Sequence, residues 1–136
     1  MKTSIYPAFI AALLLSTVGL ARAEIAVVVN PKAPVTALSV NQAAQVFSGR
    51  AGSYRLLDLP ESSALRSEFY RKTTEKDPAQ MKALWAKLIF TGRAAPPKEV
   101  NSAAEIKKAV AADEKAMGYI DAKEVDGSVK VVLLLN

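Results

Sequence analysis

The residues of this chain best placed for chemistry are two adjacent serines, Ser62 and Ser63, with Arg66 three positions further on. They follow Pro60, which ends a short apolar run, and they precede a pattern of residues typical of a helix. A helix start presents backbone N–H groups that have no partner inside the helix, and it carries a partial positive charge. Hydroxyl and guanidinium groups beside such N–H groups are suited to holding a small anion. The stretch therefore predicts an anion-binding site formed by Ser62, Ser63 and Arg66.

Each of these residues also has a purely structural interpretation. Ser62 and Ser63 are favoured helix caps, a role worth about 1 kcal/mol, and a capped helix still offers N–H groups to a ligand. Arg66 stands in a charged helix, so a solvent-exposed position is the alternative to anion contact. Glu61 suits the helix dipole, yet it repels a phosphate-like ion unless it accepts a proton from the ligand. Ser39 heads an earlier helix and is a further candidate ligand, with a capping box as its alternative role.

Composition removes several classes of function. The chain contains no cysteine and no histidine, so disulfides, the usual transition-metal sites and triad-type hydrolysis are not expected. No phosphate-binding glycine loop or nucleophile elbow is present either, and we expect neither an enzyme nor a bound cofactor. The net charge is +5, which falls to +3 once Lys2 and Arg22 are removed with a leader. This mild balance favours small anions as ligands and does not indicate nucleic-acid binding.

Residues 1–23 have the pattern of a secretory signal peptide. Lys2 supplies the positive start, residues 8–20 form an apolar run, and Ala21-Arg22-Ala23 is a typical cleavage site. The run is too short for a stable membrane span, and we expect none after cleavage. The sequence therefore predicts a periplasmic protein that consists of one domain, residues 24–136.

Apolar patterning predicts strands that alternate with helices, which indicates an α/β fold with a mainly parallel sheet flanked by helices. The helices are marked at their starts by Ser39 with Gln42, by Ser63, by Asp77 with Gln80, and by Ser102. The strands are expected at 25–29, 55–59, 117–120 and 129–135. The helices are expected from Ser39 to Gly49, at 63–73, from Asp77 up to Gly92, and at 102–112. Residues 94–98 are expected to form a proline-containing connector.

The order of several short landmarks resembles a known family. They are Val27-Val28-Val29-Asn30, Leu38-Ser39, Val46-Phe47-Ser48-Gly49, Glu61-Ser62-Ser63 with Arg66 and Phe69, Trp85, Phe90-Thr91-Gly92, and Met117-Gly118-Tyr119-Ile120. In this order they resemble the phosphate-binding, type II periplasmic solute-binding proteins of ABC importers. The resemblance implies a layered α/β lobe, a phosphate-like oxyanion as ligand, and a membrane transporter or another periplasmic protein as partner.

Two departures from that family bear on function. Members with a complete site are about twice this length, because two lobes clamp the ligand, so the resemblance covers a single lobe. The anion loop of the family reads Arg-x-Asp-Gly-Ser-Gly-Thr, whereas this chain has Leu59 in the Arg position, Glu61 for Asp, Ser62 and Ala64 for the glycines, and Leu65 for Thr. We therefore expect weak binding of phosphate or a related oxyanion. The alternative is a periplasmic protein-interaction module that has lost its ligand.

Overall fold

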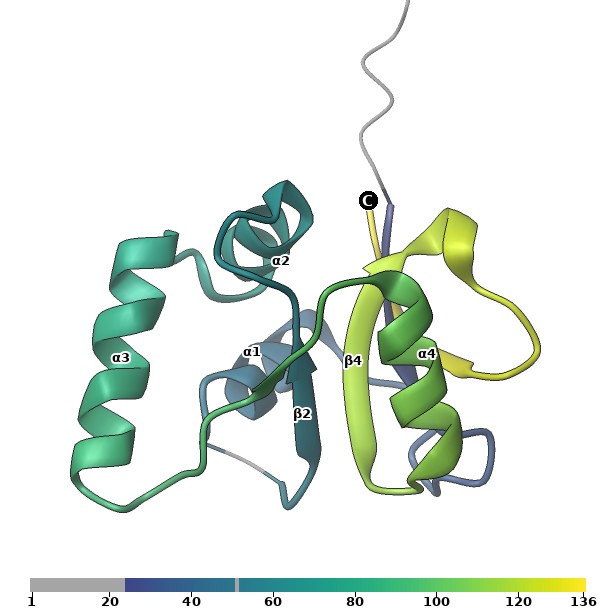
Figure 1. Cartoon of the computed structure of the whole chain (residues 1–136), viewed down its shortest axis with the longest axis horizontal. Coiled ribbons are helices and arrows are strands. Elements are labelled where there is room, and N and C mark those ends of the chain that lie inside the picture. Colours follow the sequence, from purple (N-terminus) through teal and green to yellow (C-terminus); the bar gives the residue numbers. More distant parts are fainter. Residues whose placement is uncertain (1–23, 51) are drawn as a thin grey trace, which may run out of the picture.

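The computed structural model describes residues 24–50 and 52–136. The predicted signal peptide, residues 1–23, lies outside the described residues. The elements follow in the order β1 (Ile25–Val29), α1 (Val40–Phe47), β2 (Arg55–Asp58), α2 (Ala64–Thr74), α3 (Pro78–Phe90), β3 (Lys98–Glu99), α4 (Ala103–Ala112), β4 (Ala116–Asp121), a 3-10 turn (Ala122–Glu124) and β5 (Lys130–Leu135). Figure 1 shows their arrangement.

The strands of the described residues form a single sheet in the order β3-β2-β4-β1-β5. β2 pairs in parallel with β3 and β4, whereas β1 pairs antiparallel with both β4 and β5. Four strands therefore run in one direction and β1 runs against them. The order of strands and helices confirms the predicted α/β class, and the common direction of four strands confirms the mainly parallel sheet. The two-residue strand β3 is not among the predicted strands, and it begins at the end of the predicted connector. It is too short and too polar to leave a periodic signal in the sequence.

Helices cover both faces of this sheet (Figure 1). α4 packs on one face, where Ile106 lies so close to Gly118 that a Cβ at position 118 would stand 2.7 Å from it. α1 and α2 pack on the opposite face, and α3 stands to the outside of α2. The fold is thus three-layered, as expected for a lobe with α/β alternation.

The helix starts are set by local side chains. Ser39 with Gln42 and Asp77 with Gln80 form complete capping boxes, in which each side chain bonds to the backbone N–H of the other residue. Ser102 caps α4 through the backbone N–H of Glu105. These starts agree with the sequence-based expectation because capping needs only residues within one turn.

Beneath α1 and α2 lies an aromatic cluster made of Phe47, Phe69, Tyr70 and Tyr119, all of which are buried. Phe69 stacks on Tyr119 with ring centres 4.0 Å apart and ring planes at 8°, and Phe47 meets both rings edge-on. Each aromatic pair of this kind contributes about 0.5–1.5 kcal/mol beyond the area it buries. The cluster fastens α2 to β4 and brings two tyrosine hydroxyls to the end of β2.

Candidate functional site

The carboxylate of Asp58, the last residue of β2, is the centre of a buried polar network that sequence reasoning missed. The residue is 4% exposed. It accepts hydrogen bonds from the Tyr70 hydroxyl at 2.6 Å, from the backbone N–H of Leu59 at 2.9 Å, and from the Tyr119 hydroxyl. The signal in the sequence was a lone acid inside an apolar run, since Asp is rarely buried unless it has partners.

Arg66 supplies the positive charge that this buried carboxylate needs. Its Nε lies 3.8 Å from Asp58 Oδ1, and its Nη1 donates a 2.8 Å hydrogen bond to the carbonyl oxygen of Leu59. The guanidinium also stands over the Tyr70 ring at 5.8 Å, and the side chain is only 17% exposed. The solvent-exposed interpretation of Arg66 is therefore wrong. The arginine points back toward the end of β2, and most of its bonding capacity there is directed to the protein itself.

The network also holds its tyrosines in the neutral form. Burial raises the pKa of Tyr70 and of Tyr119 above the usual tyrosine range, and the nearby charge of Asp58 raises both further. A neutral phenol can donate to a carboxylate, whereas an ionised one cannot. Asp58, Tyr70 and Tyr119 thus form a structural donor–acceptor set around one charge.

Ser63 caps α2, with its hydroxyl oxygen accepting the backbone N–H of Arg66 at 3.2 Å. Ser62 precedes it and is exposed, while Ser63 is half-buried. Within the described part of the chain, the next two backbone N–H groups, of Ala64 and Leu65, have no acceptor. The capping interpretation of Ser63 is correct, and free N–H groups remain beside it, as the anion interpretation requires.

Ser39 lies elsewhere in the fold. It is exposed and caps α1, and the adjoining residues Val40 and Asn41 line a groove together with residues 72–76, the C-terminal turn of α2. Ser63 stands at the opposite end of that helix. The structure therefore brings together Ser62, Ser63 and Arg66, and it does not bring Ser39 to them.

A hollow of about 290 Å³ lies beside Arg66, between the start of α2, α3 and the segment that leads into β3. Its charged lining comprises three carboxylates and two cations, namely Asp58, Glu61, Glu99, Arg66 and Lys82. Apolar side chains of α3, among them Trp85 and Ile89, form the remaining wall. Because Ser62 and Ser63 do not line this hollow and its charge is slightly acidic, an anion would be held at the helix start and not inside the hollow.

The helix start occupies a special place in the topology. β2 and β4 are neighbouring parallel strands, and the chain leaves β2 toward β3 but leaves β4 toward β5 on the other side. In α/β proteins, the point where two such connections diverge beyond the carboxyl ends of the strands is the usual place for a ligand. The geometry is that of an α/β fold with a helix start at the carboxyl edge of the sheet.

Several solved structures with a similar fold carry names that refer to phosphate transport or phosphate binding. An ABC-type phosphate transport receptor from Vibrio cholerae matches with 23% identity and a TM-score of 0.57, over 81% of this chain and 46% of that one. A phosphate ABC transporter substrate-binding protein with bound phosphate from Clostridium perfringens matches with 21% identity and a TM-score of 0.65, over 81% and 45%. PstS from Borrelia burgdorferi matches with 12% identity and a TM-score of 0.54, over 81% and 47%.

These matches establish the fold, a single lobe like those of phosphate-type substrate-binding proteins. The chain spans less than half the length of each matched structure. By sequence, no protein-family model matches the chain and no curated relative is found.

Within residues 24–50 and 52–136, no helix is long and apolar enough to cross a membrane. Nor does that part of the chain gather three or more carboxylate, thiol or imidazole side chains that could hold a metal ion.

Proposed function

We propose that this protein is a non-catalytic, exported binding protein that takes up phosphate or a related oxyanion weakly at the start of α2. The observation that carries the proposal is the pair of free N–H groups, of Ala64 and Leu65, at the carboxyl edge of the sheet where the chain connections diverge. Ser62 and Ser63 would add hydroxyl groups to these N–H groups. The likeness to structures named for phosphate transport supports the same kind of ligand.

The charges around the helix start define which anion fits. Arg66 is already bonded to Asp58 and to the Leu59 carbonyl, so only part of its charge is available to a ligand. Leu59 itself is 7% exposed and packs into the core. Glu61 is exposed beside the site and repels any acceptor-only anion. A hydrogen phosphate ion can donate a proton to such a carboxylate, whereas sulfate cannot, and the site therefore favours phosphate.

The affinity should be low because the ligand would be covered from one side only. Small-molecule sites with high affinity bury most of the ligand surface, and the helix dipole is worth about 0.3–1 kcal/mol at an exposed position. We expect binding of phosphate in the millimolar range unless a partner or a second copy covers the site.

Isothermal titration calorimetry with phosphate, sulfate and molybdate tests the proposal. Ser63→Ala should weaken phosphate binding several-fold, because it removes a hydroxyl and loosens the first turn of α2. Ser102→Ala is the matched control, since Ser102 caps α4 by the same contact with the backbone. Absence of heat at millimolar phosphate, or equal affinity in the two variants, would remove the proposal.

A second candidate is a protein-interaction module that has kept the lobe and lost the ligand. One observation favours it: Phe90 at the end of α3 is 92% exposed, and its neighbour Ile89 is 49% exposed. Exposed aromatic residues beside apolar neighbours are typical of interfaces. Co-purification of the tagged protein from periplasm tests this function. It predicts a stoichiometric partner that is retained with or without phosphate and is lost in Phe90→Ser.

A further inference from the structure

A polar groove runs along α1 and faces the C-terminal turn of α2. It has a volume of about 420 Å³, within the range of small-molecule sites. One wall follows α1 from Val40 to Ser48, and the other consists of residues 72–76. We call it the α1–α2 groove. It is separate from the proposed oxyanion site, because it adjoins the opposite end of α2, a helix of 11 residues that is roughly 16 Å long.

The ionisable groups that line this groove are mostly cationic. Arg50, Lys72 and Lys76 contribute three positive charges, and Glu75 contributes one negative charge. One more carboxylate contacts a cation of the groove. Glu68 lies one turn before Lys72 on α2, and its Oε1 is 3.6 Å from the Lys72 Nζ. The C-terminal end of α2 disfavours an anion, so the three cations must outweigh it for an anion to bind.

Lys72 is the residue that most needs a ligand. Its side chain is 15% exposed, and its Nζ is buried without a hydrogen-bond acceptor in residues 24–50 and 52–136. The contact with Glu68 Oε1, at 3.6 Å, is too long for a hydrogen bond. Buried polar groups nearly always have a partner, and a buried ammonium is costly without one. The lysine side chain is flexible, and once turned toward the groove its ammonium would gain the missing acceptor from an oxygen-rich anion bound there.

Neutral polar residues line the same groove as this ammonium. Ser48, at the end of α1, and Thr73, on the last turn of α2, are both buried residues that line the groove. The Thr73 hydroxyl already donates to the carbonyl oxygen of Phe69 at 2.8 Å, whereas Ser48 caps α1 through its backbone N–H and not through its hydroxyl. Ser48 can therefore donate to a ligand that Lys72 and Arg50 attract.

We propose that the α1–α2 groove binds a small multivalent oxyanion, with Lys72, Arg50 and Lys76 as its charged contacts and Ser48 as a neutral donor. More than one anionic group is required because the cations are distributed over both walls of the groove. Inorganic pyrophosphate, which carries two anionic groups, is the probe for this chemistry. Inorganic phosphate, which carries one, is the comparison.

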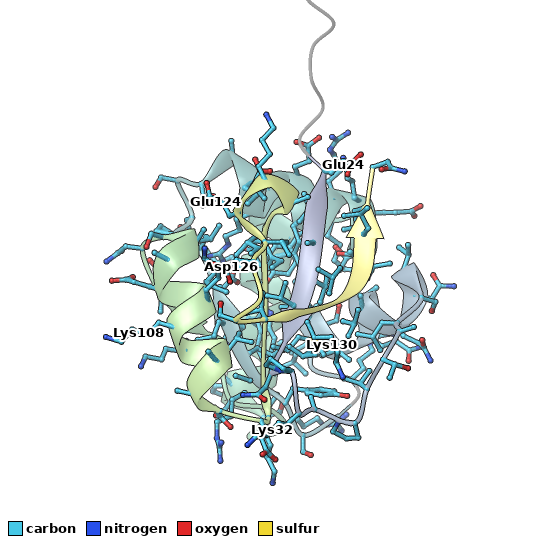
Figure 2. The ribbon with its side chains drawn as sticks, turned by 90° about the vertical axis from the view of Figure 1, so that its right-hand side faces the viewer. Glu24, Lys32, Lys108, Glu124, Asp126 and Lys130 are labelled. Atoms are coloured by element: carbon cyan, nitrogen blue, oxygen red, sulfur yellow. The ribbon has the colours of Figure 1, made fainter. Side chains whose placement is uncertain are left out.

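Calorimetry with pyrophosphate on the wild-type protein and three variants tests the proposal. Lys72→Met should weaken binding about ten-fold or more, which is the size of a lost hydrogen bond to a charged group. Arg50→Gln should weaken it at least three-fold and leave the fold intact, because Arg50 is exposed. Lys108→Met is the matched control. Figure 2 shows Lys108 on α4, pointing away from the sheet on the face opposite α1 and α2, and this variant should bind as the wild type does.

Amide NMR spectra locate the bound anion. Pyrophosphate should shift the signals of Ser48, Thr73 and Thr74, and it should leave those of Ala64 and Leu65 at the proposed oxyanion site less affected. Binding that is unchanged in both Lys72→Met and Arg50→Gln would overturn the proposal. So would the absence of heat with the wild type at millimolar pyrophosphate, or shifts confined to the start of α2. Shifts confined to the start of α2 would support the oxyanion site at Ser63 while overturning the groove proposal, so the two proposals fail separately.

Discussion

The Nε of Arg66 on α2 lies 3.8 Å from the Oδ1 of Asp58 on β2, and both side chains are withdrawn from solvent. The arginine could neutralise a bound anion, yet in this fold it neutralises a carboxylate of its own chain. The contact fastens the start of α2 to the end of β2. It also leaves the proposed oxyanion site dependent on backbone N–H groups and hydroxyls.

Loss of Arg66 should destabilise the fold. Arg66→Met leaves Asp58 buried with its tyrosine and backbone donors but without a positive partner, and we expect the free energy of unfolding to fall by about 3 kcal/mol. Urea denaturation followed by circular dichroism measures the change. Arg71→Met is the control, because the Arg71 side chain is 69% exposed and its contact with Glu68 is a surface pair, worth less than about 1 kcal/mol. An equal decrease in the free energy of unfolding in the two variants would show that the contact between Arg66 and Asp58 does not stabilise the fold.

The tyrosines around Asp58 should make stability fall in alkali. Both have a folded-state pKa raised above the reference value of 10.0, so the unfolded chain loses these protons first. The stabilising contribution is complete below pH 10 and declines as the pH rises above it. In Tyr119→Phe the decline above pH 10 should be shallower, while the stability at pH 7 should be lower by about 1.5–3 kcal/mol, since a hydrogen bond to a charge is lost. Denaturant titrations at a series of pH values test this, and parallel curves for wild type and variant would contradict it.

The carboxylate beside the helix start should select among anions. Glu61→Gln removes a negative charge next to Ser62 and should strengthen sulfate binding several-fold, corresponding to roughly 1 kcal/mol of relieved repulsion. Phosphate should gain less, because it also loses a carboxylate that can accept its proton. Competition calorimetry gives both affinities. Glu124→Gln, which changes an exposed acid on the turn after β4, should leave the ratio of the two affinities unchanged.

Removal of the buried ammonium should stabilise the protein when no anion is present. Lys72→Met replaces a buried ammonium that has no hydrogen-bond acceptor within the described residues with an apolar group, and we expect the free energy of unfolding to rise by about 1 kcal/mol. Pyrophosphate should raise the melting temperature of the wild type, since a ligand of the native state stabilises it, but not that of Lys72→Met. Lys108→Met should respond to pyrophosphate as the wild type does. A strongly destabilised Lys72→Met protein would instead indicate that the Glu68 contact is structural.

Export should remove residues 1–23. Expression with the natural N-terminus followed by intact-mass spectrometry of the periplasmic fraction should give a chain that begins at Glu24. Replacement of Ala23 by a large residue, as in Ala23→Arg, should block cleavage at this position and leave a heavier protein, because the cleavage site requires small residues. An unprocessed mass for the wild type would contradict the prediction.

The helix starts and the apolar strands were determined by the sequence itself. Ser39 with Gln42, Asp77 with Gln80, and Ser63 with Arg66 each interact within a single turn. The run of Ile25–Val29 is apolar enough to require burial wherever it lies. Interactions of such short range can be recognised from spacing alone.

Tertiary structure decided which of these parts meet. The Tyr119 hydroxyl reaches Asp58 across 61 positions of sequence, and nothing in either local pattern indicates that contact. The direction of β1, the pairing of the short β3 and the separation of Ser39 from Ser63 likewise depend on how the sheet is assembled. Arg66 had several partners within reach of a flexible side chain. The burial of Asp58, a charge that must be compensated when water is excluded, favours the position of the guanidinium at the end of β2.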